Sequence, residues 1–213
     1  MNVLVIGANG KIGRMVSAFL AEKNDVVHAM IRDKNQAKYF HELGIDTIVA
    51  DLEKDFSHAC EGMDAIIFTA GSGAHTGPDK TLLIDRDGAI KAIDEATKRG
   101  INRFVLVSSL RAEQPEAGPE SLQLYLQAKR DADIHLQASS LDYTIIRPGT
   151  LSDDSGTGKV SIADHLAYQP QPIPRIDVAH TIVETLKQKN TYRRTFDLLP
   201  GNQTISDALN RLE

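Results

Sequence analysis

The 213 residues include no tryptophan and a single cysteine, and aromatic side chains make up only 5% of the chain. Because Cys60 has no second cysteine to pair with, an internal disulfide and a thiolate zinc site are both excluded, and a reducing compartment fits. The scarcity of aromatic residues leaves few stacking platforms for single-stranded nucleic acid.

Basic charge is scarce as well. Lys and Arg number 24 against 29 Asp and Glu, a formal net charge of −5, so no global positive field attracts phosphate backbones or acidic membranes. No apolar run approaches the ~18 residues of a membrane span, and the first residues enter a strand pattern without the features of a signal peptide. We therefore expect a cytoplasmic protein with no nucleic-acid or membrane partner, present as a monomer or a homodimer.

Short apolar runs alternate with longer amphipathic stretches, a pattern typical of parallel strands joined by helices. The expected strands are 3–6, 26–31, 45–49, 65–68, 104–107, 143–146 and 195–198. The expected helices are 11–22, 35–43, 56–60, 79–99, 120–139, 176–189 and one from 205 onward. We predict one Rossmann-like α/β domain with three α/β/α layers and a doubly wound parallel sheet. Residues 1–150 form the dinucleotide-binding core and 151–213 a small cap on it.

A glycine-rich turn stands between the first strand and the first helix. In Gly7-Ala8-Asn9-Gly10-Lys11-Ile12-Gly13, Gly7 permits the tight turn, Gly10 lets the backbone approach a pyrophosphate and Gly13 lets the helix pack against the sheet. Free amides and the positive end of the helix dipole then face the anion. Glycines also mark ordinary turns, but the strand before and the helix after favour a dinucleotide site. Its expected residues here are Gly7, Asn9, Gly10, Lys11, Ile12 and Gly13.

The second strand ends in Arg32-Asp33, where a dinucleotide site must accommodate the adenosine ribose. An aspartate there favours a free 2′-hydroxyl, whereas an arginine pairs with a 2′-phosphate. Because Arg32 comes first, we expect NADP rather than NAD. The alternative is that Arg32 is a solvated charge and Asp33 caps the next helix.

Further motifs resemble the short-chain dehydrogenase/reductase superfamily, in its atypical branch of small NAD(P)-binding, epimerase/dehydratase-like or NmrA-like proteins. Tyr125-Leu126-Gln127-Ala128-Lys129 matches the Tyr-x-x-x-Lys of that superfamily, and Ser108-Ser109 falls where its catalytic Ser or Thr lies. The resemblance implies cofactor contacts from these residues after successive strands: Asp51, Leu52, Thr69, Ala70, Gly71, Ser108, Pro148, Gly149 and Thr150. Most of these segments follow predicted strands, at the sheet edge where open α/β sheets bind ligands.

The chemistry is expected at Tyr125. Lys129 lies four residues later on the predicted helix, so its ammonium shares a face with the phenol and stabilises the phenolate of a general acid/base. By the resemblance, Lys129 also binds the nicotinamide ribose and Ser109 orients the reacting oxygen. In isolation, Tyr125 and Lys129 are typical of an ordinary amphipathic helix with a solvated lysine. Their position on the helix that follows the Ser108-Ser109 strand end favours a catalytic role.

Two other positions bear on the site. Superfamily members often carry an asparagine on the helix after the fourth strand, where this chain offers Asp85, either paired with a neighbouring base or exposed. His75 lies in a glycine-rich loop beside the predicted nicotinamide cleft, where a polar loop residue is commoner than a substrate contact. The seven histidines are dispersed without metal-ligand spacing, so we expect no metal.

These features predict an NADP-dependent oxidoreductase that acts on a small carbonyl or alcohol, since few residues remain after the sixth strand to enclose a large substrate. The alternatives are an epimerase or dehydratase of a sugar-like substrate, a quinone or flavin reductase, and a regulator that senses NADP(H) without turnover.

Overall fold

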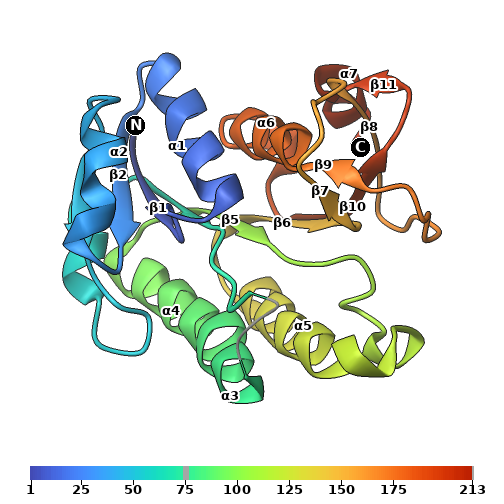
Figure 1. Ribbon diagram of the computed structural model, residues 1–213, viewed down its shortest axis with the longest axis horizontal. Helices are drawn as coiled ribbons and strands as arrows, with labels where there is room; N and C mark the ends of the chain where they lie inside the picture. The colour runs from blue at the N-terminus through green and yellow to red at the C-terminus, as the bar shows by residue number, and fades with distance from the viewer. Residues whose placement is uncertain (74–76, 213) are drawn as a thin grey trace.

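The computed structural model describes residues 1–73 and 77–212. Within these ranges one sheet has the strand order β11-β8-β10-β6-β5-β4-β1-β2-β3, and a small separate sheet pairs β7 with β9 (Figure 1). The strands are β1 (Asn2–Ile6), β2 (Val26–Ile31), β3 (Asp46–Val49), β4 (Ala65–Phe68), β5 (Arg103–Val107), β6 (Asp142–Pro148), β7 (Leu151–Ser152), β8 (Lys159–Ala163), β9 (Ile173–Pro174), β10 (Arg194–Pro200) and β11 (Gln203–Thr204).

The run from β3 to β10 is parallel throughout, and β8 and β11 add antiparallel pairs at one edge. The chain builds β1, β2 and β3 toward one edge and then returns to place β4 on the other side of β1. Strand order therefore reverses between β1 and β4, and open α/β sheets bind ligands at the carboxyl ends of the strands beside such a reversal.

Helices cover both faces of the sheet (Figure 1). One layer holds α1 (Lys11–Glu22), α2 (Ala37–His41), α6 (Arg175–Thr185) and α7 (Ile205–Asn210), and the other holds α4 (Ala89–Arg99) and α5 (Gln123–Ala138). The short α3 (Pro78–Lys80) and the π-helix η3 (Thr81–Gly88) lead into α4. The 3-10 turns are η1 (Lys34–Gln36), η2 (Ser57–Cys60), η4 (Pro115–Ala117), η5 (Glu120–Leu122) and η6 (Lys189–Thr191).

Two apolar cores hold the layers together, because successive side chains of a strand point to opposite faces. In β1, Val3 and Val5 belong to the core under α1 and α6, whereas Leu4 and Ile6 belong to the core under α4 and α5. All four side chains are fully buried. Strands buried on both faces explain the continuous apolar runs of the sequence.

Buried Arg103 ties the amino end of β5 to the end of α6. Its guanidinium donates to the carbonyls of Thr185, Leu186 and Asp142 at 2.7–2.9 Å and to two threonine hydroxyls. Burial lowers the pKa of Arg103 to about 10. The carbonyls at the end of α6 carry the negative end of the helix dipole, so they partly compensate the buried charge.

The predicted fold class is confirmed. The bounds of α1, β2 and β4 agree with the prediction, but the helix expected over 79–99 is divided, because η3 replaces the α-helix over Thr81–Gly88. The segment after β6 contributes more of the sheet than expected: β10 pairs with β6 in parallel, and the unpredicted β8 and β11 extend it.

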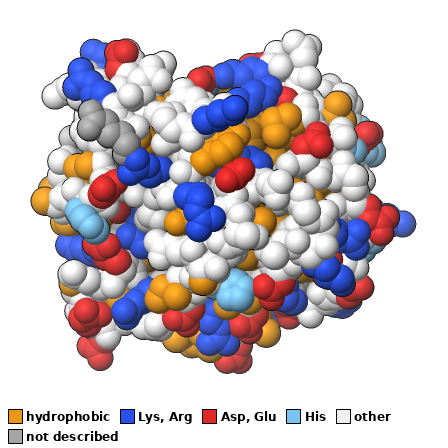
Figure 2. Space-filling view, turned by 180° about the vertical axis from the view of Figure 1, so that it is seen from behind, with side chains coloured by type: hydrophobic (Ala, Val, Ile, Leu, Met, Phe, Trp, Pro, Cys, Tyr) orange, Lys and Arg blue, Asp and Glu red, His pale blue; other side chains and the backbone are white. Residues whose placement is uncertain are grey.

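Acidic and basic side chains are intermingled on the face shown in Figure 2. Among residues 1–73 and 77–212, none of the helices has both the length and the apolar character to cross a membrane.

Candidate dinucleotide site

The turn after β1 requires its first glycine. Gly7 adopts a φ of +80°, and a Cβ there would lie 2.5 Å from the amide nitrogen of Ala70, so a larger residue would displace the start of the β4 loop. The Gly10 amide donates to the Gly7 carbonyl at 3.0 Å, and α1 begins at the next residue. Because Gly10 has no side chain that could cap α1, the backbone amides of the first turn are available to hydrogen-bond an anion.

A cavity of about 400 Å³ opens at this turn, along the carboxyl ends of β1 to β4. The predicted cofactor residues that line it are Gly7, Asn9, Gly10, Arg32, Asp51, Leu52, Thr69, Ala70 and Gly71. Eight other lining residues were not predicted as cofactor contacts: Ile6, Met30, Ile31, Gln36, Ala50, Ser72, Lys80 and Ile84. The cavity thus lies at the sheet edge and strand reversal where a dinucleotide is expected, and its residues fit the adenosine and phosphate half of that cofactor.

Arg32 and Asp33 have different roles at the end of β2. Asp33 Oδ1 accepts a hydrogen bond from the Asn35 amide at 2.9 Å, and Asp33 with Gln36 forms a capping box on η1. Arg32 is exposed and lines the cavity, and its guanidinium makes no hydrogen bond or ion pair with the rest of the described chain. The carboxylate is therefore engaged in capping, while the guanidinium is available to a ligand.

Other predicted cofactor residues lie outside the cavity lining. Lys11 pairs with Asp153, which also accepts from Arg175 at 2.8 Å. These two cations lower the pKa of Asp153, the Lys11 hydrogen bond most. The remaining predicted cofactor residues outside the lining are Ile12, Gly13, Ser108, Lys129, Pro148, Gly149 and Thr150.

Lys129 and Tyr125 meet at the end of β5. Lys129 Nζ lies 5.7 Å from the centroid of the Tyr125 ring and donates to the Val107 carbonyl at 3.2 Å. Nζ also pairs with Asp85 Oδ1 at 3.1 Å, and the Lys129 and Asp85 side chains are 4% and 0% exposed. Of the two possibilities for Asp85, the structure therefore shows pairing with a base.

The surroundings of Lys129 keep its ammonium charged. Burial by itself would lower the pKa of Lys129, but Tyr125, Asp85 and Asp133 together raise the pKa above its usual value. Opposite charges within a few ångströms favour the charged form.

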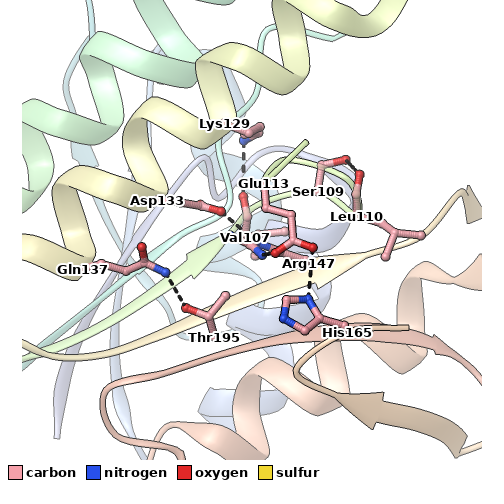
Figure 3. A network of polar contacts seen from close by, with 10 residues as sticks. All are labelled: Val107, Ser109, Leu110, Glu113, Lys129, Asp133, Gln137, Arg147, His165 and Thr195. Carbon is pink, nitrogen blue, oxygen red and sulfur yellow. Dashed lines mark hydrogen bonds and ion pairs between the residues drawn. The ribbon is translucent and has the colours of Figure 1, made fainter. Parts of the chain in front are cut away.

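A separate chain of polar contacts leads from buried Asp133 to the exposed His165 (Figure 3). Arg147 donates from Nε to Asp133 at 2.9 Å and from NH1 to Glu113 at 3.1 Å, and Glu113 lies 3.0 Å from His165 Nδ1. Burial raises the pKa of Asp133 to about 6, against the opposing effects of Arg147 and the nearby Ser108 hydroxyl. Within residues 1–73 and 77–212, neither Ser108 Oγ nor Asp133 Oδ1 has a partner that meets hydrogen-bond geometry.

Ser109 is half-buried, and its hydroxyl donates to the Leu110 carbonyl at 3.3 Å (Figure 3).

A second cavity of about 430 Å³ lies beside α5 and includes Glu113, Arg147 and His165, but none of the three predicted catalytic residues lines it. Buried Asp133 was not among the residues predicted from the sequence. His75 lies outside the described residues.

Similarity to known proteins identifies the family of this chain. Residues 7–189 match the NAD(P)H-binding family. The chain belongs to that family. A Bacillus subtilis relative named "Uncharacterized sugar epimerase YhfK" is 47% identical over 216 residues, which cover all of both chains.

Two solved structures are similar over nearly the whole chain. A Bacillus halodurans protein with the provisional name NAD-dependent epimerase/dehydratase is 48% identical, covers 99% of each chain and superimposes with a TM-score of 0.96. The oxidoreductase ylbE from Lactococcus lactis is 29% identical over 99% of this chain and 95% of its own, with a TM-score of 0.88. These likenesses support the atypical short-chain dehydrogenase/reductase assignment and a nicotinamide cofactor.

Proposed function

We propose that the protein is an NADP-dependent oxidoreductase that transfers a hydride between the nicotinamide and a small carbonyl or alcohol. The observation that carries this proposal is the buried Lys129 ammonium, 5.7 Å from the Tyr125 ring centroid and fixed at the end of β5. A charged lysine in this position stabilises a phenolate and thereby suits the neighbouring tyrosine to proton transfer.

Each residue of the proposed site has one task. When bound, the nicotinamide supplies or receives the hydride. In the reductive direction the Tyr125 hydroxyl gives its proton to the substrate oxygen, and the resulting phenolate is stabilised by Lys129 until solvent restores the proton. Ser109 donates a hydrogen bond to the same oxygen and so favours the developing negative charge.

The preference for NADP rests on Arg32. Its guanidinium borders the cavity without a partner among the described residues, while the neighbouring Asp33 carboxylate is occupied in capping η1. A free guanidinium suits a 2′-phosphate, and an engaged carboxylate does not compete for a ribose hydroxyl.

Epimerisation or dehydration of a sugar-like substrate is the second candidate, because two relatives at 47% and 48% identity carry such names. An epimerase oxidises and then reduces the same substrate, so it consumes no cofactor over a full turnover. Net NADPH oxidation therefore distinguishes the two candidates.

The test compares wild type with Tyr125→Phe on a panel of small carbonyls and quinones, following NADPH oxidation. We expect kcat/KM on a carbonyl to fall about a hundredfold or more, with the Kd of NADPH unchanged. Tyr143→Phe is the matched control, since Tyr143 lies near the amino end of β6, opposite the ligand edge. Equal oxidation by wild type and Tyr125→Phe would overturn the acid/base role and favour direct reduction of a quinone or flavin. Absence of NADPH oxidation in wild type would overturn the oxidoreductase and leave the epimerase or dehydratase and the NADP(H) sensor.

A further inference from the structure

Asp85 joins two parts of the molecule through its two carboxylate oxygens. Oδ1 lies 3.1 Å from Lys129 Nζ, and Oδ2 accepts the Ser72 amide at 3.0 Å. Ser72 and Gly71 line the cofactor cavity. A Cβ at Gly71 would lie 3.2 Å from Asp85 Oδ1, so the glycine permits this close approach. One carboxylate thus connects the wall of the cofactor cavity with the buried lysine.

The backbone around Asp85 is unusual. Asp85 lies within the π-helix η3, and η3 packs along α5, which carries Lys129. π-helical segments are rare and occur frequently at functional sites. Two residues later, Asp87 pairs with Arg86 and its side chain is 39% exposed. The same short segment therefore contains one fully buried carboxylate and one on the surface.

Three groups act on the Lys129 charge from the elements packed around it. Asp85 comes from η3, and Tyr125 and Asp133 come from α5. Asp133 is shared with Arg147 of β6, which donates to it at 2.9 Å. Asp85 is the carboxylate in direct contact with the ammonium, so its removal would leave a buried lysine whose pKa falls.

We propose that Asp85 is the positioning residue of Lys129. It keeps the buried ammonium charged and directed to the end of β5, and it links that ammonium to the Gly71–Ser72 wall of the cofactor cavity. The inference rests on the proposed oxidoreductase function, but the ionisation of Lys129 is measurable without any turnover.

The experiment follows the titration of Lys129 by NMR in protein labelled with ¹³C at lysine Cε, with the signal assigned by its loss in Lys129→Met. Asp85→Asn keeps the shape of the side chain and removes its charge, and Asp87→Asn is the matched control from the same π-helix. We expect Asp85→Asn to lower the titration midpoint of Lys129 by about one pH unit or more, a tenfold weaker proton affinity. The alkaline limb of the pH profile for NADPH oxidation moves down with it. The control leaves both unchanged.

An unchanged Lys129 midpoint in Asp85→Asn, or an equal shift in Asp87→Asn, would overturn the proposal. If Asp85→Asn does not fold, the double variant with Lys129→Met removes both charges. A folded double variant then supports the coupling, and an unfolded one overturns it because Asp85 would serve the fold independently of Lys129. A shifted midpoint combined with full activity of Tyr125→Phe would refute the proposed chemistry and leave the positioning role intact.

Discussion

Replacement of Arg32 by alanine is expected to weaken NADP binding about tenfold and to leave NAD binding unchanged. A hydrogen bond between charged groups contributes roughly 1.5–3 kcal/mol when formed. Arg32 is exposed at the rim of the cavity, so solvent screening places its contribution at the lower end, and about 1.4 kcal/mol corresponds to a tenfold change in Kd.

Isothermal titration calorimetry with NADP and NAD is the suitable assay, since the chain has no tryptophan to report binding by fluorescence. Lys34→Ala makes the same change in net charge two residues away, at an exposed position outside the cavity lining. It is expected to leave both affinities nearly unchanged. Equal losses of NADP affinity in Arg32→Ala and Lys34→Ala would show a general charge effect, and no loss in Arg32→Ala would refute the phosphate contact.

Three further predictions concern stability and reactivity. Arg103→Met is expected to lower the free energy of unfolding in urea by about 3 kcal/mol or more, because buried carbonyls lose their donor; Arg99→Met, at a half-exposed ion pair, should cost less than about 1 kcal/mol. The pKa of Asp133 is raised from 3.8 to about 6, so its stabilising contribution is full below pH 3.8 and is lost as the pH rises toward 6. The stability of wild type relative to Asp133→Asn should therefore fall by about 2 kcal/mol between pH 4 and pH 7, and a pH-independent difference in urea denaturation would contradict it. Burial raises the pKa of the Cys60 thiol to about 11, so iodoacetamide at pH 7.5 should label Cys60 in urea and not in the native protein; rapid native labelling would contradict this.

Local sequence patterns were sufficient for the parallel core. The run 65–68 is apolar and buried throughout because both of its faces meet apolar neighbours. The run 26–31 is apolar except for His28, and it is buried from Ala29 to Ile31 while Val26 is exposed. The β8 strand was missed because Val160 and Ile162 offer only a brief alternation after Gly158, and its pairing with β10 depends on contacts far along the chain. Similarly, apolar periodicity over 79–99 indicates a helix without distinguishing an α-helix from the π-helix η3.

Some residues of the candidate site could likewise be predicted from the sequence, and others could not. The glycine turn and the strand-end residues could be found from spacing, because the phosphate-binding geometry constrains residue types at fixed intervals. The burial of Asp133 and its contact with Arg147 could not be predicted from the sequence, because a charged residue on an amphipathic helix is usually solvated. Only the fold brings Arg147 of β6 against Asp133 of α5. Asp85 showed a departure from the superfamily pattern, yet only the fold identified Lys129 as its partner.

The most direct test of the proposed function is transfer of the label from NADPH that carries deuterium at C4 of the nicotinamide, on the face from which hydride leaves. With a small carbonyl substrate, mass spectrometry of the product should show deuterium on the carbon that bears the new hydroxyl, and Tyr125→Phe should slow its appearance about a hundredfold or more. Product without deuterium, or equal rates in wild type and Tyr125→Phe, would contradict a Tyr125-assisted hydride transfer.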